Sequence, residues 1–278
     1  CFYSKIEIYM AYGTYDLVVL GGGPGGYVAA IRASQLGLRV VIIESEHLGG
    51  ICLNWGCIPT KALLRAAEVY NLAKRLGEFG VSASDLCIDL PKIIDRSRKV
   101  AAQLTEGVAH LLKKNKIEVI QGRGRILEIG KVAVELRDGG DHQVVASNIL
   151  IATGARAREI PGFEVDKSLI WSYREAMMPK ELPNSLLVVG SGAIGIEFAS
   201  FFNDLGVEVT VVELKEQILP SEDTEISDLA RKSFEKAGIK FHTSSSITSL
   251  ERVSNNVIAT IDCGKGSLIQ LEADRVIM

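Results

Sequence analysis

A strand–glycine loop–helix–strand unit occurs twice in this sequence, and the repetition constrains the fold more than any other feature. The first copy occupies residues 15–44 and the second residues 185–213. Seven positions correspond at a constant offset of 169 residues: Gly21, Gly23, Gly26, Leu36, Gly37, Val40 and Glu44 match Gly190, Gly192, Gly195, Leu205, Gly206, Val209 and Glu213. A lone glycine motif is weak evidence, but two such units in register are not expected by chance. We therefore predict an α/β fold with two Rossmann-like nucleotide-binding domains.

The glycine spacing and the terminal glutamate are typical of a dinucleotide site. The first glycine makes the tight turn, the second lets the backbone approach a pyrophosphate, and the third lets the helix pack on the strand. The phosphates are expected at the helix N-terminus, where free N–H groups and the helix dipole favour negative charge. Glu44 and Glu213 are expected to bind a ribose 2′-hydroxyl, and an acid there repels a 2′-phosphate, so the second copy is predicted to prefer NAD. The alternative is that both loops are ordinary turns and both glutamates are solvated strand ends.

The segments outside the two copies predict the domain organisation. Residues 61–80 and 91–115 have helical spacing, and the second helix is expected to begin at Pro91. The strand-like pieces IEVIQG, RILEI, KVAVEL and QVVASNILIAT, separated by glycine or charged turns, predict a β-meander inserted between residues 117 and 151. Similar pieces after residue 242 predict a second insertion. With a hinge near Ile160-Pro-Gly162, we predict domains at 1–155 and 156–278.

Composition limits the classes of protein to consider. The chain has 278 residues, 47% hydrophobic and 23% charged, with a net charge of −3. These values describe a two-domain globular protein and give no electrostatic reason to expect nucleic acid or membrane as a partner. The N-terminal residues resemble neither a signal peptide nor a transit peptide, and we interpret Met10 as the native start and residues 1–9 as an extension. The five cysteines, an odd number, argue against a secreted disulfide framework and favour the cytoplasm.

The pair Cys52 and Cys57 admits four interpretations: zinc ligands, a structural staple, two inert side chains or a redox couple. Zinc usually needs a second ligand pair at short spacing, and none is present; a staple is unusual in a reducing compartment. Cys87 and Cys263 are expected to be inert core residues. In a regular helix, positions i and i+5 lie about 8.6 Å apart at Cα, whereas a disulfide needs roughly 4.4–6.8 Å. A redox couple therefore requires a distorted backbone, which Gly56 and Pro59 favour.

Four motifs together carry a family resemblance. They are GGGPGG at 21–26, CLNWGCIPTK at 52–61, ATG at 152–154 and GSGAIGIE at 190–197. These motifs resemble the flavin-dependent pyridine nucleotide–disulfide oxidoreductases, and the resemblance covers nearly the whole chain from about Met10. It is closest to the branch that oxidises protein-bound dihydrolipoamide with NAD⁺. Glutathione reductase is expected to have basic residues where Glu213 stands, and mercuric reductase is the nearer alternative.

The resemblance implies a role for each matching residue. Cys52 exchanges with the substrate dithiol, Cys57 contacts the flavin as a charge-transfer thiolate, and Lys61 pairs with Glu197 near the flavin. The alternative for this pair is a helix residue that extends its amine to solvent and a first-turn acid favoured by the helix dipole. The residues expected at FAD are Gly21, Gly23, Pro24, Gly25, Gly26, Glu44, Gly50, Lys61, Thr153 and Gly154. Those expected at NAD are Gly190, Gly192, Ile194, Gly195 and Glu213.

The resemblance also implies parts that this sequence does not contain. Members of the family have a later segment that completes the FAD domain and a C-terminal interface domain that forms the homodimer. That domain supplies a histidine–glutamate base, and no histidine here sits in such a motif. The implied partner is the lipoyl domain of 2-oxoacid dehydrogenase complexes. We therefore expect a flavoenzyme incomplete for catalysis by itself, and the alternative is a catalytically incompetent nucleotide-binding fragment.

Overall fold

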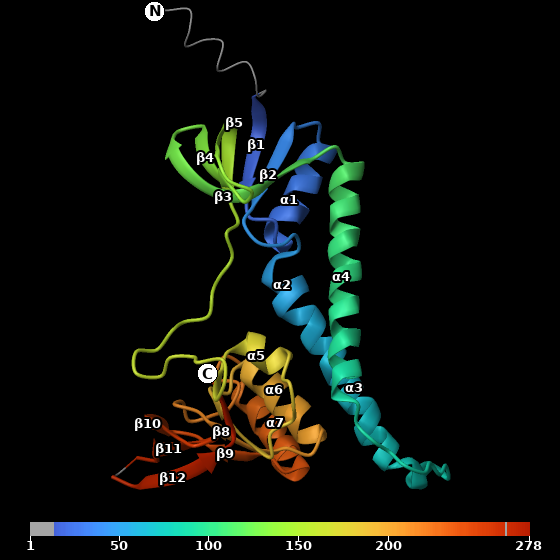
Figure 1. The fold of residues 1–278 in the computed structure, drawn as a ribbon, viewed down its shortest axis with the longest axis vertical. Helices are drawn as coiled ribbons and strands as arrows, with labels where there is room; N and C mark the ends of the chain where they lie inside the picture. The colour runs from blue at the N-terminus through green and yellow to red at the C-terminus, as the bar shows by residue number, and fades with distance from the viewer. Residues whose placement is uncertain (1–13, 265) are drawn as a thin grey trace, which may run out of the picture. The chain divides into compact units, whose positions relative to one another are not determined.

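The computed structural model describes residues 14–264 and 266–278, so the interpretation of Met10 and residues 1–9 lies outside the described part. The chain divides into two compact units (Figure 1). The first contains the described residues up to 58 together with 98–156, and the second contains 59–97 and 157–278. Helices α3 (Cys57–Lys74) and α4 (Leu90–Lys114) each contribute residues to both units. The predicted cofactor domains, 1–155 and 156–278, stay a prediction.

The first unit is built around a closed five-stranded barrel. Its strands are β1 (Tyr15–Leu20), β2 (Val40–Glu44), β3 (Glu118–Glu128), β4 (Lys131–Leu136) and β5 (Asp141–Ile151). β1 pairs in parallel with β2 and β5, and β2 pairs in parallel with β3. β4 joins β3 and β5 in antiparallel fashion and closes the barrel. Helix α1 (Pro24–Gln35) connects β1 to β2 and completes the predicted repeat.

The predicted break between IEVIQG and RILEI is wrong, because both belong to the single strand β3. β3 pairs with β2 as far as Gln121 and with β4 from Gly122 onward. A side chain at Gly122 would lie 2.4 Å from the carbonyl oxygen of Glu135. This glycine therefore allows close approach where the strand changes partner, and does not mark a turn. β5 changes partner in the same way, from β4 to β1.

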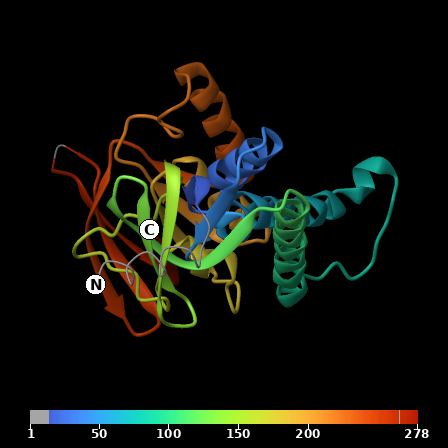
Figure 2. The same ribbon diagram turned by 90° about the horizontal axis from the view of Figure 1, so that it is seen from above.

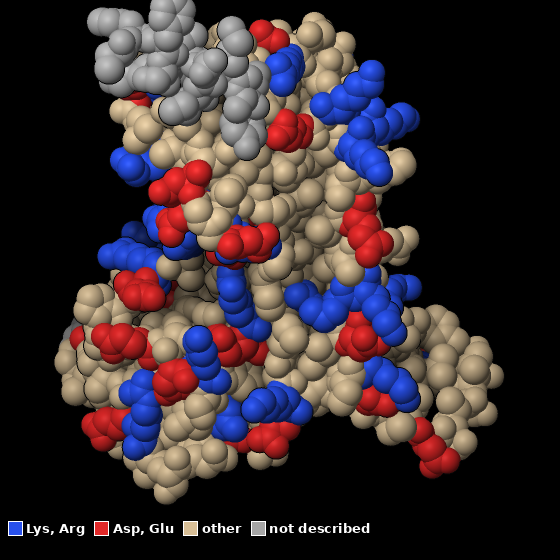
Figure 3. Space-filling model, turned by 45° about the horizontal axis from the view of Figure 1, so that its top comes forward, with Lys and Arg blue, Asp and Glu red and all other residues tan. Residues whose placement is uncertain are grey.

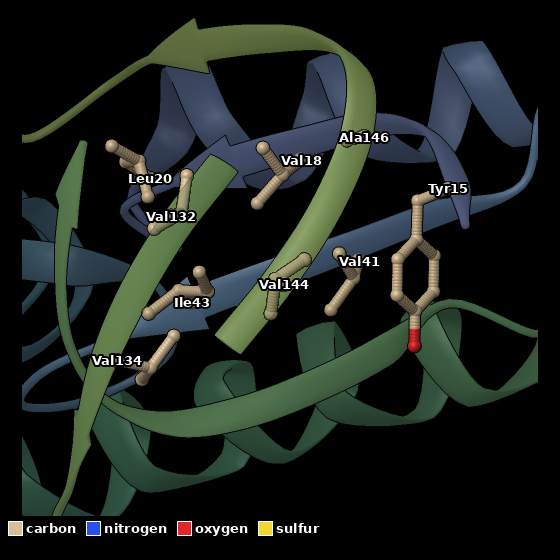
Figure 4. Close-up of a cluster of buried hydrophobic side chains, with 9 residues drawn as sticks. All are labelled: Tyr15, Val18, Leu20, Val41, Ile43, Val132, Val134, Val144 and Ala146. Atoms are coloured by element: carbon tan, nitrogen blue, oxygen red, sulfur yellow. The ribbon is translucent and has the colours of Figure 1, made fainter. Parts of the chain in front are cut away.

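Two apolar clusters cover the two faces of the parallel strands. The interior of the barrel holds Tyr15, Val18, Leu20, Val41, Ile43, Val132, Val134, Val144 and Ala146 (Figure 4). On the outer face, Val19 and Ile42 pack with Ala30 of α1 and with Val108 and Leu112 of α4. Figure 2 shows α4 nearly end-on. β2 is buried along its whole length because it contributes side chains to both clusters.

The second unit repeats the strand–helix–strand unit within an open five-stranded sheet. Its five parallel strands lie in the order β6 (Ile170–Trp171), β13 (Arg275–Ile277), β7 (Ser185–Val189), β8 (Glu208–Val212) and β9 (Lys240–His242). The helices are α5 (Tyr173–Met177), α6 (Ala193–Asp204) and α7 (Thr224–Ala237). A three-stranded antiparallel sheet is formed by β10 (Ser246–Val253), β11 (Asn256–Asp262) and β12 (Leu268–Ala273). The predicted α/β fold with two Rossmann-like halves and a meander in each is confirmed.

The two helices predicted between the repeats are present with small changes at their ends. The first, α3, begins at Cys57 and is followed by the short 3₁₀ helix η2 (Leu76–Phe79). The second, α4, begins at Leu90, so Pro91 lies in its first turn, where its missing N–H costs no hydrogen bond. In the described part of the chain, no helix is both long and apolar enough to cross a membrane. Figure 3 shows acidic and basic side chains interspersed on the face in view.

Asp166 fastens the loop before β6 in the second unit. Its carboxylate accepts hydrogen bonds from the backbone N–H groups of Ser168, Leu169 and Ile170, at 2.8–2.9 Å. It also pairs with Arg252 of β10 at 2.6 Å. Burial by itself raises the pKa of Asp166, but Arg252 and the three N–H groups outweigh burial and lower the pKa to about 2. The charged carboxylate therefore holds this loop against the antiparallel sheet.

We expect Asp166→Asn to remove a pH-dependent part of the stability. Because the folded-state pKa of Asp166 lies below its usual 3.8, its contribution is complete above about pH 4 and is lost as the pH falls toward 2. The difference in free energy of unfolding between wild type and Asp166→Asn, measured with urea, should shrink over this range. Arg252→Met, which leaves the three N–H donors, should give an intermediate result. A difference that is constant from pH 5 to pH 2 would contradict this role.

Candidate functional site

The first glycine loop is tied to the glutamate that ends β2. The N–H of Gly22 donates to Oε2 of Glu44 at 2.6 Å, and the N–H of Glu46 donates to Oε1 at 2.6 Å. The glutamate is only 7% exposed. Gly23 precedes helix α1, and among the described residues no side chain caps this helix. The carboxylate is thus fixed beside a helix N-terminus whose first N–H groups have no side-chain acceptor.

The second loop reproduces these hydrogen bonds. Oε2 of Glu213 accepts from the N–H of Ser191 at 2.8 Å and from its hydroxyl at 2.7 Å, and Oε1 accepts from the N–H of Lys215 at 2.8 Å. Burial raises the pKa of Glu213, but these hydrogen bonds outweigh burial and the net pKa is lowered. Glu213 is 6% exposed, so neither glutamate is the solvated strand end of the alternative interpretation. The sequence did not predict that each glutamate also holds its own glycine loop by accepting a hydrogen bond from the loop backbone.

The uncapped ends of α1 and α6 distinguish them from two other helices. α5 is capped by Ser172 and α7 by Asp223, whose side chains accept from the first-turn backbone. α6, like α1, follows a glycine, and no side chain of the described residues caps it. Since the N–H groups at a helix start seek an anionic or polar acceptor, α1 and α6 suit the phosphates of a dinucleotide. The bare backbone and the buried carboxylate of each loop fit such a ligand.

The third glycine of each loop sets how closely the helix approaches the strand. A side chain at Gly26 would lie 1.9 Å from the carbonyl oxygen of Gly21, and one at Gly195 would lie 2.1 Å from that of Gly190. Both distances are far shorter than any van der Waals contact. Only glycine therefore permits the observed loop in either copy.

Other predicted cofactor residues gather at the first loop. Gly50 approaches Gly23 so closely that a side chain on it would lie 2.8 Å from the Gly23 Cα. A side chain at Gly21 would lie 3.3 Å from the Cα of Thr153, and Gly154 follows in the chain. Pro24 and Gly25 form the first turn of α1. In the second unit, Ile194 is in the first turn of α6 and is 63% exposed.

The cysteine pair forms a disulfide across a break between two helices. Helix α2 (Gly50–Trp55) ends at Gly56, and α3 begins at Cys57. The Cys52 and Cys57 Cα atoms lie 4.8 Å apart, compared with about 8.6 Å in a continuous helix. Gly56 sits in the crowded break, where a side chain would lie 3.1 Å from the carbonyl oxygen of Ile51. The predicted distortion is confirmed at Gly56.

Two predictions about nearby residues are wrong. Pro59 does not interrupt a helix, because it lies in the first turn of α3, where no intrahelical N–H bond is lost. Cys87 is not a core residue: it is exposed, in a segment without helix or strand that packs little against the rest of its unit. Cys263 is half-buried and packs against the second unit's core. Within the described residues, no three His, Cys, Asp or Glu side chains are arranged to hold a metal.

Residues of α4 support the disulfide loop, and sequence analysis missed them. Arg98 donates to the carbonyl oxygen of Asn54 at 2.8 Å, and its guanidinium lies 4.9 Å from the centre of the Trp55 ring. Thr105 donates its hydroxyl to Oδ1 of Asn54 at 3.2 Å. Burial lowers the pKa of Arg98. The available signal was a pair of polar residues spaced seven apart on α4, which places both on one face of the helix.

Lys61 and Glu197, predicted as a pair, form an ion pair in the second unit. It links α3 to α6, and the side chains are 61% and 28% exposed. Two further contacts join these helices: Asn71 donates to Oδ1 of Asp204 at 3.0 Å, and Lys74 donates to its carbonyl oxygen at 3.2 Å. Glu197 is not in the first turn of α6, so the interpretation as a first-turn acid is wrong.

Comparison with known proteins places this geometry in a family. The family described as pyridine nucleotide-disulphide oxidoreductase matches residues 15–278. The chain belongs to this family. Its predicted cofactors, FAD and NAD, are those that the family uses.

Two curated relatives show how much of a longer protein this sequence represents. The chain is 48% identical over 279 residues to the dihydrolipoyl dehydrogenase of Rhizobium etli, covering 95% of this chain and 58% of the relative. It is 51% identical over 254 residues to the dihydrolipoyl dehydrogenase of Zymomonas mobilis, covering 91% and 54%. The chain thus spans little more than half the length of the curated relatives it matches.

Solved structures of the family are similar in fold. LpdA from Mycobacterium tuberculosis has a TM-score of 0.85 and 28% identity, covering 94% of this chain and 57% of that one. The HOCl-induced flavoprotein disulfide reductase RclA from Escherichia coli has a TM-score of 0.78 and 27% identity, covering 95% and 55%. The oxidoreductase fold extends over almost all of the present sequence.

We expect Gly26→Ala to destabilise the first unit. Its added methyl group would overlap the Gly21 carbonyl oxygen, which should cost about 1–3 kcal/mol or more. Gly25→Ala is the matched control, since its methyl group would meet nothing within 4 Å. That variant should stay within about 1 kcal/mol of wild type or be more stable. Urea unfolding measures both, and equal stabilities would contradict the close-packing role of Gly26.

Proposed function

We propose that this chain is part of a dihydrolipoyl dehydrogenase, which oxidises protein-bound dihydrolipoamide to lipoamide and reduces NAD⁺. The observation that carries the proposal is the Cys52–Cys57 disulfide, formed across a helix break in the unit that also holds the first glycine loop. Curated relatives that are 48% and 51% identical bear that name. A disulfide beside a nucleotide loop suits a redox couple better than a staple.

In the proposed exchange, a thiolate of dihydrolipoamide attacks Sγ of Cys52, and Cys57 leaves as a thiolate. The second substrate thiol then attacks the mixed disulfide, which releases lipoamide and leaves Cys52 and Cys57 as a reduced pair. Two electrons have moved from the substrate to the cysteines. Cys57 is exposed and Cys52 is half-buried. As implied by the family resemblance, Cys52 is assigned the exchange and Cys57 the thiolate next to the cofactor.

The glycine loops are the proposed cofactor sites. The N-terminus of α1, Glu44, Gly50 and the residues following β5 are assigned to FAD. The N-terminus of α6 and Glu213 are assigned to NAD. FAD, when bound, supplies the two-electron carrier between the cysteine pair and NAD⁺. As implied by the family resemblance, the Lys61–Glu197 pair is assigned a positioning role near the flavin; the ion pair between α3 and α6 supports the pairing of the two residues.

The proposal extends to the binding partner, the oligomeric state and the cellular location. A lipoyl domain of a 2-oxoacid dehydrogenase complex would deliver the substrate dithiol, and the whole protein would be a cytoplasmic homodimer. The thiol exchange needs a base, which the family resemblance assigns to a histidine–glutamate pair in a further domain. We propose that the present 278 residues carry cofactor binding and the cysteine couple but do not turn over dihydrolipoamide alone.

The absorbance spectrum tests the flavoenzyme assignment. The chain mixed with FAD should stay yellow after gel filtration and gain a long-wavelength band on partial reduction, when the Cys57 thiolate faces the flavin. Cys52→Ser should show this band without reduction, and Cys57→Ser should lack it. Dihydrolipoamide should convert the disulfide to two alkylatable thiols. A colourless chain that still binds NADH would overturn the proposal and favour a nucleotide-binding fragment.

Glu213→Gln should reduce the preference for NADH over NADPH by about tenfold or more, because the repulsion of a 2′-phosphate is removed. NADH itself should bind more weakly, since the loop loses a charged acceptor. Fluorescence titration with each nucleotide measures both dissociation constants. Glu44→Gln is the matched control: it occupies the same place in the first loop and should weaken FAD retention without changing the NADH/NADPH ratio. An unchanged ratio in Glu213→Gln would contradict the assignment of the second loop.

A further inference from the structure

Helix α2 is a six-residue helix that ends inside the loop closed by the disulfide. The last carbonyl groups of any helix lack partners within that helix. The Asn54 carbonyl lies in this last turn, between the two cysteines, and it accepts a hydrogen bond from Arg98. A guanidinium on another helix thus satisfies a carbonyl group at the point where α2 stops.

Four further contacts hold the same turn. The amide of Asn54 donates to the carbonyl oxygens of Leu48 and Gly50, each at 2.9 Å. Its Oδ1 accepts from Thr105. The guanidinium of Arg98 also lies within cation–π distance of Trp55. All these residues belong to the first unit, so the contacts do not depend on where the second unit lies.

The disulfide requires the break between α2 and α3. Were residues 50–74 one straight helix, the two Cα atoms would lie about 8.6 Å apart and the sulfur atoms could not bond. Once the disulfide is reduced, the covalent restraint on the break disappears, whereas a noncovalent restraint remains. A contact that favours the broken form therefore also favours the disulfide over the dithiol.

We propose that Arg98 is a positioning residue for the redox couple: by binding the Asn54 carbonyl and stacking on Trp55, it keeps α2 ended at Trp55 and stabilises the oxidised pair. This inference rests on the proposed function of Cys52 and Cys57. The reaction it biases is the exchange with a dithiol. The Cys52–Cys57 bond breaks, two thiols form on the protein, and the dithiol becomes a cyclic disulfide.

The test is a redox titration of the full 278-residue chain. Wild type and Arg98→Met are equilibrated in dihydrolipoamide/lipoamide mixtures, the thiols are alkylated, and the reduced fraction is measured by mass spectrometry. Arg98→Met should shift the equilibrium about tenfold toward the dithiol, the size expected from losing one charge-assisted hydrogen bond. A tenfold shift equals about 30 mV for a two-electron couple. An unchanged constant, or a disulfide harder to reduce, would overturn the inference.

Arg96→Met is the matched control. Arg96 lies on the same helix and also donates to a backbone carbonyl, that of Ala62 at 3.0 Å, outside the disulfide loop. The Arg96→Met variant should have an equilibrium constant for disulfide reduction within about twofold of wild type. An equal shift in both variants would overturn the inference, because general weakening of α4 would then be the cause.

Thr105→Val provides a second test in case the Arg98→Met protein does not fold. It removes only the hydrogen bond to Oδ1 of Asn54 and should shift the equilibrium in the same direction by a smaller factor. No shift in a folded Thr105→Val protein would count against the inference. The proposed function is judged by wild type alone: if its disulfide does not titrate reversibly, that proposal fails whatever the variants do.

Discussion

In each half of this protein, the backbone of a helix presses against the turn that ends the preceding strand, and the geometry of both glycine loops depends on that contact. Gly26 meets the carbonyl oxygen of Gly21, and Gly195 meets that of Gly190, with no room for a methyl group. The approach turns the start of α1 and of α6 toward the edge where the parallel strands end. Glu44 is the last residue of β2, and Glu213 directly follows β8, so each carboxylate lies at this edge of its own sheet. In each half, packing alone therefore brings together the start of the helix, the backbone of the glycine loop and the carboxylate.

The position of the disulfide depends on backbone contacts with the first glycine loop. Gly50 at the start of α2 lies against Gly23, and the N–H of Gly49 donates to the carbonyl oxygen of Gly22 at 2.8 Å. Helix α2 is thereby fixed to the glycine loop, and its short length places Cys52 near its middle. The break at Gly56 then brings Cys57 within bonding distance. A single chain of backbone contacts links the first glycine loop to the cysteines.

Sequence patterns predicted the features that depend on local spacing. The two loops, their glutamates and the helix distortion at Gly56 could be inferred from residue types at short separations. The errors arose where contacts between residues far apart in the sequence determine the structure. Residues 123–124, between IEVIQG and RILEI, were taken for a turn because a glycine in a strand pattern does not reveal a change of strand partner. Arg98 and Thr105 were missed because their contacts with Asn54 span 44 and 51 residues, and only the packing of α4 brings them there.

The carboxylates of Glu44 and Glu213 are both held before any ligand arrives. Each has one oxygen bonded to its loop and the other to the backbone two residues further on. The side-chain entropy is therefore lost during folding. Under the proposed function, a nucleotide that binds there need not order its acceptor. On that proposal, the affinity for the ribose becomes a property of loop rigidity. Substitutions that loosen the backbone at Gly22 or Ser191 would weaken binding while leaving every ligand-contacting side chain in place.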